Sequence, residues 1–170
     1  MQQHRALILR GNRFLGSSLV DKGLLSMNDL ESANEKFMES IQGGEMRHAS
    51  ILTPLIYDLK VLEEDKMIEY MAEEYELGLV DLSFIKLQSL RPIDVDLDLC
   101  WATSTLPFDY VDGVYLVATC YYLSAPVVKH WEDSLDGRVI WYVTSCTSMA
   151  RALDRIAEIH QAEDDAEDED

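Results

Sequence analysis

Three cysteines and four histidines are the side chains of this sequence that could supply a nucleophile, a general base or a soft metal ligand. Their spacing favours none of these roles. Cys100, Cys120 and Cys146 are far apart and form no CxxC pair, and the histidines form no HxxxH or HExxH pattern. Catalysis by a cysteine with His130 as its base would also need an oxyanion hole, for which no motif is present. We therefore expect buried, reduced thiols, no metal and no cofactor.

Two further chemistries are disfavoured by what their motifs lack. Asp94, Asp96 and Asp98 alternate with apolar residues, but a calcium loop starting at Asp94 would need glycine at its sixth position and glutamate at its twelfth. A solvated acidic edge is the simpler interpretation of these three carboxylates. The phosphate-binding pattern GxxxxGK[ST] does not occur, so nucleotide hydrolysis has no sequence support. We expect a protein without enzymatic activity.

The charge of the chain restricts its partners. Asp and Glu number 32 against 14 Lys and Arg, which gives a net charge of −18. Such a field repels phosphate backbones, so we expect no nucleic-acid binding and a protein partner with a basic surface. Apolar runs are too short for membrane insertion or for a secretory leader, which favours a cytoplasmic location. Acidic residues dominate the segment 161–170, and we expect a disordered tail there.

Apolar spacing in the first half of the chain predicts helices. A stripe that opens at Leu15 ends at Gly23, and Ser26 is placed to cap a second helix that Gly43 and Gly44 terminate. Further stripes cover 51–59 and 67–75, the second with acidic residues in its first turn. Residues 79–82 are a short extended apolar segment. The sequence thus predicts a helical subdomain over 1–90 that contains two degenerate helix-pair repeats.

The second half changes to strand patterns. Residues 106–111 and 114–120 flank Asp112-Gly113, which predicts a β-hairpin with a tight turn. Ser124 is placed to cap a helix, 139–143 forms a strand, and a final helix carries Met149 and Leu153. Residues 94–99 fit either a strand edge or the start of a helix. We predict an α+β fold in which a small α/β subdomain, β-β-α-β-α over 91–160, follows the helical one.

Residues 15–26, LGSSLVDKGLLS, resemble the opening L-G-x-x-L-V-x-x-G-L-[IL]-S of the N-terminal domains (GspE-N or MshEN type) of type II secretion and type IV pilus assembly ATPases. Residues 73–82, EEYELGLVDL, resemble the closing segment of the same domains, A-E-Q-[FY]-G-L-P-[FY]-V-D-L. Order and spacing agree over about residues 13–160. The resemblance implies the non-catalytic domain of these proteins, since their ATPase chemistry is in a later domain.

MshEN-type members bind cyclic di-GMP through two repeats of the pattern R-L-G-x-x-[LVI]-[LVI]-x-x-G followed by L-x-x-x-L-x-x-Q. The resemblance therefore implies a ligand site in the first repeat, carried by five residues: Arg13, Leu15, Gly16, Gly23 and Leu30. This chain departs from the pattern, because Phe14 separates Arg13 from Leu15 and Phe37 replaces the glutamine. In the second repeat Ile51, Thr53, Lys60 and Glu74 occupy the positions of Arg, Gly, Gly and Gln. A carboxylate at Glu74 would repel a phosphate ligand.

Two functions follow from the resemblance. The first is a docking or regulatory module that binds a protein partner of a secretion, type IV pilus or motility machine. The alternative is a degenerate cyclic di-GMP receptor that uses the first repeat, which the departures disfavour. Tyr121-Tyr122, directly after a predicted strand, is a further candidate contact patch.

Overall fold

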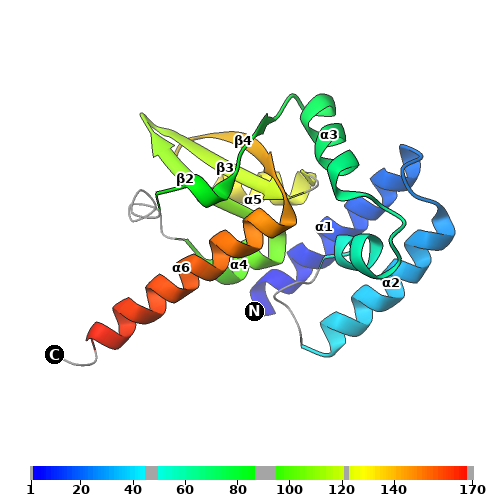
Figure 1. The fold of residues 1–170 in the computed structure, drawn as a ribbon, viewed down its shortest axis with the longest axis horizontal. Helices are drawn as coiled ribbons and strands as arrows, with labels where there is room; N and C mark the ends of the chain where they lie inside the picture. The colour runs from blue at the N-terminus through cyan, green and yellow to red at the C-terminus, as the bar shows by residue number, and fades with distance from the viewer. Residues whose placement is uncertain (1, 45–49, 87–94, 121–122, 168–170) are drawn as a thin grey trace.

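The computed structural model describes residues 2–44, 50–86, 95–120 and 123–167. Helical elements come first along the chain (Figure 1): α1 Gln2–Asp21, α2 Met27–Gln42, the π-helical turn η1 Pro54–Asp58 and α3 Glu64–Glu74. The strand β1 Gly78–Leu79 and the 3-10 turn η2 Leu82–Phe84 follow. The second half contains α4 Leu97–Thr103, β2 Thr105–Val111, β3 Val114–Cys120, α5 Ala125–Ser134, β4 Arg138–Thr144 and α6 Cys146–Glu167.

The four strands form one mixed sheet in the order β1-β4-β3-β2. Strands β1 and β3 run parallel to β4, whereas β2 and β3 are the antiparallel arms of the hairpin. Asp112 and Gly113 at its tip have φ angles of 50° and 82°, the left-handed backbone that a tight hairpin turn requires. The predicted hairpin, the β-β-α-β-α order and the α+β class are confirmed.

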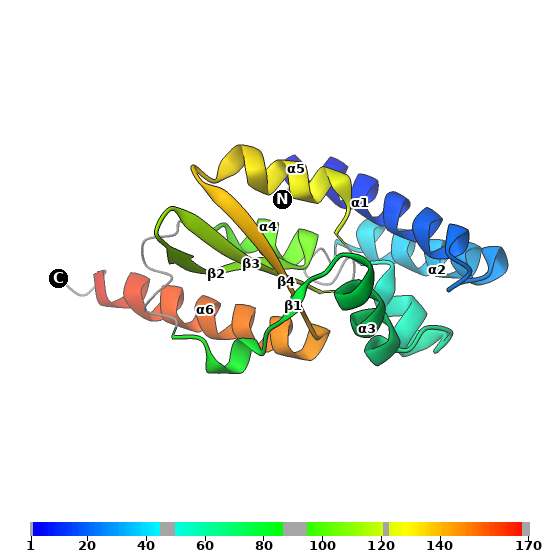
Figure 2. The ribbon, with the colours of Figure 1, turned by 90° about the horizontal axis from the view of Figure 1, so that it is seen from above.

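Helices cover both faces of the sheet (Figure 2). The view from above shows α6 along one face and α5 with α1 along the other. Trp131 of α5 donates its indole N–H to Thr105 Oγ1 at 2.7 Å, which ties this helix to β2. Leu153 and Ile156 of α6 are buried in the same continuous apolar core as Leu19 of α1. The core therefore extends from the helical half into the sheet.

The helical half follows the sequence prediction closely, with one correction. Ser26 caps α2 by accepting the backbone N–H of Asp29 at 3.1 Å, and Gly43 ends the helix. Helix α1, however, begins at Gln2, well before the predicted stripe at Leu15. Its first half is helical because Ile8 and Asn12 bury one face of it, and α1 contacts α4 and α5 there. Local periodicity could not show these distant contacts.

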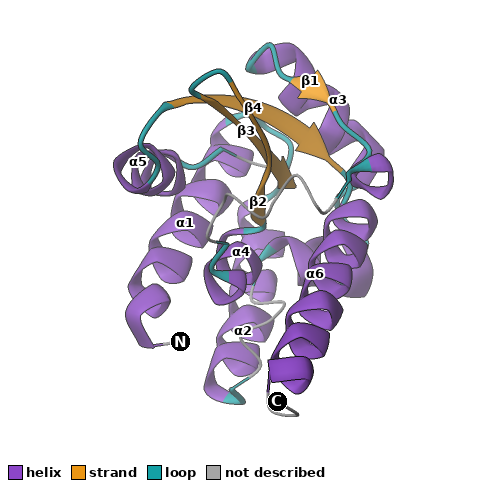
Figure 3. Cartoon of the chain, turned by 90° about the vertical axis from the view of Figure 1, so that its left-hand side faces the viewer, coloured by secondary structure: helices purple, strands orange, loops and turns teal. Residues whose placement is uncertain are grey.

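The structure refines two short segments. Of the predicted extended segment 79–82, only Leu79 belongs to β1, which Figure 3 shows at the sheet edge beside α3, and Leu82 begins the turn η2. Residues from Leu97 onward form α4, capped by Asp96, whose Oδ1 accepts the N–H of Leu99 at 3.1 Å. Asp94, Tyr121-Tyr122 and the subdomain boundary predicted near residue 90 lie outside the described residues, so the division into two subdomains stays a prediction.

Helix α6 continues to Glu167 and so includes part of the segment 161–170, where the sequence predicted a disordered tail. Among the helices in the described part of the chain, none combines the length and the apolar character that crossing a bilayer requires.

Candidate functional site

Two segments of the helical half, 37 residues apart in sequence, place turn and helix residues alike, and they are called here the first and second copy of the predicted repeat. Ser26 caps α2 of the first copy, and Glu63 stands at the N-cap of α3 in the second. Matching positions are buried in both copies, namely Leu25 with Leu62 and Leu30 with Met67. The second copy therefore shares these buried positions with the first, although the π-helical turn η1 stands where the first copy has the long helix α1.

Three of the five residues predicted for a ligand site are buried inside the first copy. They are Leu15, Gly16 and Leu30. A β-carbon at Gly16 would lie 2.6 Å from Leu30 Cδ1, closer than two carbon atoms can approach. The space beside Gly16 is therefore filled by a leucine side chain, and this glycine serves helix packing in the structure.

The other two predicted residues are on the surface. Arg13 is exposed on α1 beside Phe14, whose side chain is 51% exposed. Gly23 ends α1 with a φ of 71°, and its turn faces solvent. The structure thus places Leu15, Gly16 and Leu30 together in the core, with Arg13 and Gly23 outside it.

Asn12, which the sequence analysis did not single out, joins the two repeats. Its side-chain amide donates to the Ile8 carbonyl at 2.8 Å, and its Oδ1 accepts the backbone N–H of Ile51 at 2.7 Å. Ile51 stands where the second repeat would have its arginine. The signal was available in the sequence, because Asn12 lies at helical spacing from the apolar Ile8 and Leu15.

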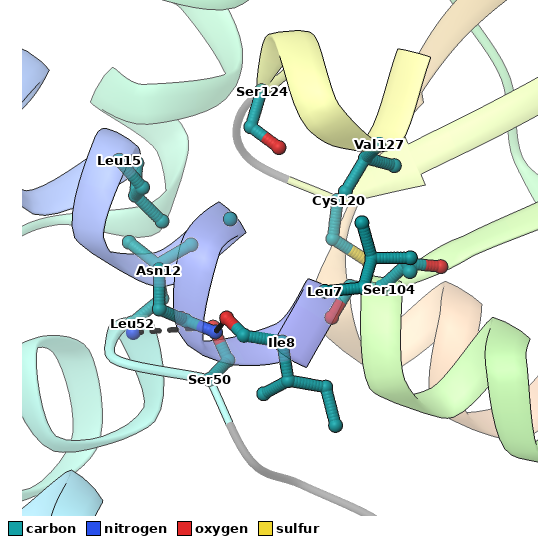
Figure 4. A pocket seen from close by; sticks show the side chains of 12 residues that line it. Leu7, Ile8, Asn12, Leu15, Ser50, Leu52, Ser104, Cys120, Ser124 and Val127 are labelled. Atoms are coloured by element: carbon teal, nitrogen blue, oxygen red, sulfur yellow. Dashed lines mark hydrogen bonds between the residues drawn. The ribbon is translucent and has the colours of Figure 1, made fainter. Parts of the chain in front are cut away.

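Asn12 also lines a small cavity between α1, α4 and the start of α5 (Figure 4). Ser124 and Cys120 face the same space from the other side, and the Ser124 hydroxyl is buried with no hydrogen-bond partner. The cavity volume is about 30 Å³, which is the volume of one water molecule. It is far too small for a nucleotide.

Two ion pairs cross between the repeats on the surface. Lys22, at the end of the first repeat's α1, donates to Glu74 Oε1 of α3 at 2.5 Å, and this hydrogen bond raises the pKa of the Lys22 amine. Asp58 of η1 in turn lies 3.7 Å from the Lys36 Nζ of α2. One ion pair therefore joins the turn after α1 to α3, and the other joins η1 to α2. Glu74, at the position where the family pattern has glutamine, is held by a lysine.

The cysteines are positioned for packing. All three thiols are free, and burial raises the pKa of the Cys100 and Cys120 thiols, so both are protonated at neutral pH. Cys146 begins α6, where its backbone N–H donates to Glu64 Oε1 at 2.7 Å. Within the described ranges, no three His, Cys, Asp or Glu side chains gather in a way that could hold a metal ion.

Comparison with known proteins identifies the fold. No protein-family model matches the sequence, and no curated protein matches it. Several chains of solved structures do, two of which are described here. One is of MshE with cdg (cyclic di-GMP), at 17% identity and a TM-score of 0.50, covering 83% of this chain and 96% of the other. The second is the N-terminal domain of XpsE, at 16% identity and a TM-score of 0.50, covering 82% and 91%. The chain therefore has the fold of the XpsE N-terminal domain and of MshE solved with cdg, as the sequence resemblance implied.

Proposed function

We propose that this chain is a non-catalytic docking module, related to the N-terminal domains of secretion and pilus ATPases, that binds a protein partner of a secretion, type IV pilus or motility machine. The observation that carries the proposal is the shared fold with the XpsE N-terminal domain, since the match spans nearly all of that domain. The net charge of −18 favours a partner with a basic surface. A cytoplasmic location fits this role.

The geometry of the repeats favours docking over nucleotide binding. Leu30 fills the space beside Gly16, so a ligand could approach the backbone there only if this leucine moved. Glu74 presents a carboxylate at a position where the nucleotide-binding pattern has an amide, and Lys22 is engaged with it. Arg13 remains exposed on the first repeat. Cyclic di-GMP binding through Arg13, Leu15, Gly16, Gly23 and Leu30 is therefore the second candidate, supported by the MshE structure with cdg.

Partner capture tests the docking function. The tagged full chain is expected to retain a component of a secretion, pilus or motility machine from a lysate of the source organism, and deletion of the gene should impair that machine. A matched control is the Met71→Asp variant, because a charge in the buried core should abolish the folded surface. Recovery of no such component, with no defect on deletion, would contradict the proposal.

Calorimetry separates the two candidates. We expect no heat when cyclic di-GMP is added to the wild type. Binding in the micromolar range that is lost in Arg13→Ala would replace the docking function with the receptor function. Lys36→Ala is the matched control. It also removes one positive charge from an exposed side chain, but Lys36 is not among the predicted ligand residues.

A further inference from the structure

The edge of the sheet at β1 exposes an unusual amount of apolar side chain. Leu79 of β1 is 68% exposed and Phe84 of η2 is 85% exposed, the largest values among the large apolar residues that the structure describes. Asp81 lies between them in sequence and is also exposed. Exposed apolar side chains grouped in this way mark interaction surfaces.

The backbone of β1 is oriented to accept another strand. Val80 donates its N–H to the Val143 carbonyl of β4 at 3.0 Å, and Gly78 is in register with Tyr142. In a parallel ladder every second residue directs its backbone groups to the same neighbour. The N–H and C=O of Leu79 therefore point away from β4, toward the side where the described residues supply no further strand.

A cavity of about 430 Å³ opens beside this edge, where the C-terminal ends of β1 and β4 meet the start of α6. Its wall combines apolar and polar side chains, which suits one long side chain of a bound segment. Apolar residues lining it include Ile68, Val80 and Val143, and polar ones include Asp81, Ser148 and Arg151. Ser83 and Ser148 donate to Asp81 Oδ1 at 2.7 and 3.3 Å and hold this carboxylate at the cavity.

The charge of this surface determines which kind of partner can bind to it. Residues 73–86 carry four acidic side chains and one lysine, and Arg151 of the cavity wall adds a positive charge, so the net charge here is −2 within a chain of net charge −18. A second copy of this chain would bring the same sign to the same edge, so self-association here is disfavoured. A segment rich in lysine or arginine would be attracted instead.

We propose that Leu79, Phe84 and the cavity at Asp81 form a docking surface for an extended, basic segment of a partner protein, which adds to the sheet beside β1. The proposal rests on the docking function above and assigns it to one surface. The partner segment pairs its backbone with the N–H and C=O of Leu79. Its apolar side chains cover Leu79 and Phe84, and a lysine or arginine reaches Asp81.

The test uses a defined probe, a blocked decapeptide of alternating lysine and valine, with alternating glutamate and valine as the control peptide. Backbone NMR shifts of the isotope-labelled full chain should change within residues 77–86 and 143–151 on addition of the lysine peptide only. Leu79→Pro should weaken binding at least about fivefold, because it removes the N–H that faces the free edge while leaving the β4 pairing intact. Phe84→Ser should weaken it similarly.

Matched controls are Leu79→Val, which keeps the N–H, and Val111→Ser, which alters an exposed apolar residue on the opposite edge strand β2. Both should bind the peptide like the wild type.

The proposal would be overturned by NMR shift changes centred elsewhere, by no binding of the lysine peptide, or by equal affinity of Leu79→Pro and wild type. Partner capture is repeated with a double variant, Leu79→Pro with Phe84→Ser. If the captured machine component binds this variant as well as the wild type, the docking function stands but this surface does not carry it. If the wild type captures no component, the docking function is overturned. The NMR shift changes caused by the lysine peptide would still test whether this surface binds a basic segment.

Discussion

Gly23 and Lys60 occupy the same left-handed turn in the two repeats, although one is a glycine and the other carries a long side chain. Their φ angles are 71° and 54°, and each lies three residues before the N-cap of the following helix. After each of them, two consecutive backbone N–H groups donate to a single carbonyl of the preceding helix: Leu24 and Leu25 to Leu19, and Val61 and Leu62 to Leu55. The turn has therefore kept its geometry while its glycine was replaced.

Replacing Lys60 with glycine should leave the free energy of unfolding within about 1 kcal/mol of the wild type. A left-handed conformation costs residues other than glycine roughly 1–2 kcal/mol, and glycine removes this cost. Glycine also raises the conformational entropy of the unfolded chain, which lowers stability by a similar amount, so the two effects nearly cancel. The reverse change, Gly23→Ala, should destabilise by about 1 kcal/mol. Urea unfolding of both variants measures this. A large loss of stability in Lys60→Gly would mean that the lysine side chain has a role of its own.

Gly16→Ala should destabilise the protein by about 1–3 kcal/mol, because the added methyl group would lie 2.6 Å from Leu30 Cδ1 and must displace it. A double variant that also carries Leu30→Val should recover part of this loss, since the two changes act at one contact. Thermal unfolding of the single and double variants provides the comparison. Ser17→Ala, an exposed position on the same helix, is the control and should melt like the wild type.

Met71→Asp should unfold the protein or destabilise it by several kcal/mol, because Met71 is fully buried in α3 and the aspartate would be an unpaired charge in the core. Glu69→Asp, an exposed change in the same helix, should have little effect. Far-ultraviolet circular dichroism during thermal unfolding distinguishes them. If Met71→Asp melted like the wild type, the helical register of residues 64–74 would be wrong.

Asp81 should titrate below the ordinary aspartate range. Hydrogen bonds from the Ser83 hydroxyl and the Ser83 backbone N–H lower the pKa of this carboxyl, and Ser148 adds to the effect. Because the folded-state pKa is lowered, the stabilisation is present above the unfolded pKa of about 3.9 and is lost as pH falls through the folded value. Carboxyl NMR titration should show the pKa rising toward its ordinary value in Ser83→Ala. An unchanged pKa in this variant would remove Ser83 as the cause.

The parts of the fold that local chemistry determines were predictable from the sequence, and the parts determined by distant pairing were not. Ser26 with Asp29 marked the start of α2, and Asp112-Gly113 marked the hairpin, because caps and tight turns depend on neighbouring residues. Strand β1 was visible only as an extended segment, since its partner Tyr142 is 64 residues from Gly78. The sequence also could not show that Leu30 fills the space beside Gly16, because this contact joins two helices.

Helix α1 is synthesised before α4 and α5, the two helices that bury its first half. Its contacts with α4 and α5 involve residues that follow it by about 75 to 130 positions, so during synthesis the part of α1 that they bury stays uncovered until they are made. At typical translation rates this delay is on the order of 5–20 s for α5, far longer than a helix needs to form. The nascent chain therefore exposes Ile8, which lies at the cavity between α1, α4 and α5, to the ribosome surface and to chaperones before the sheet exists. Late docking of this part of α1 is thus a consequence of the topology.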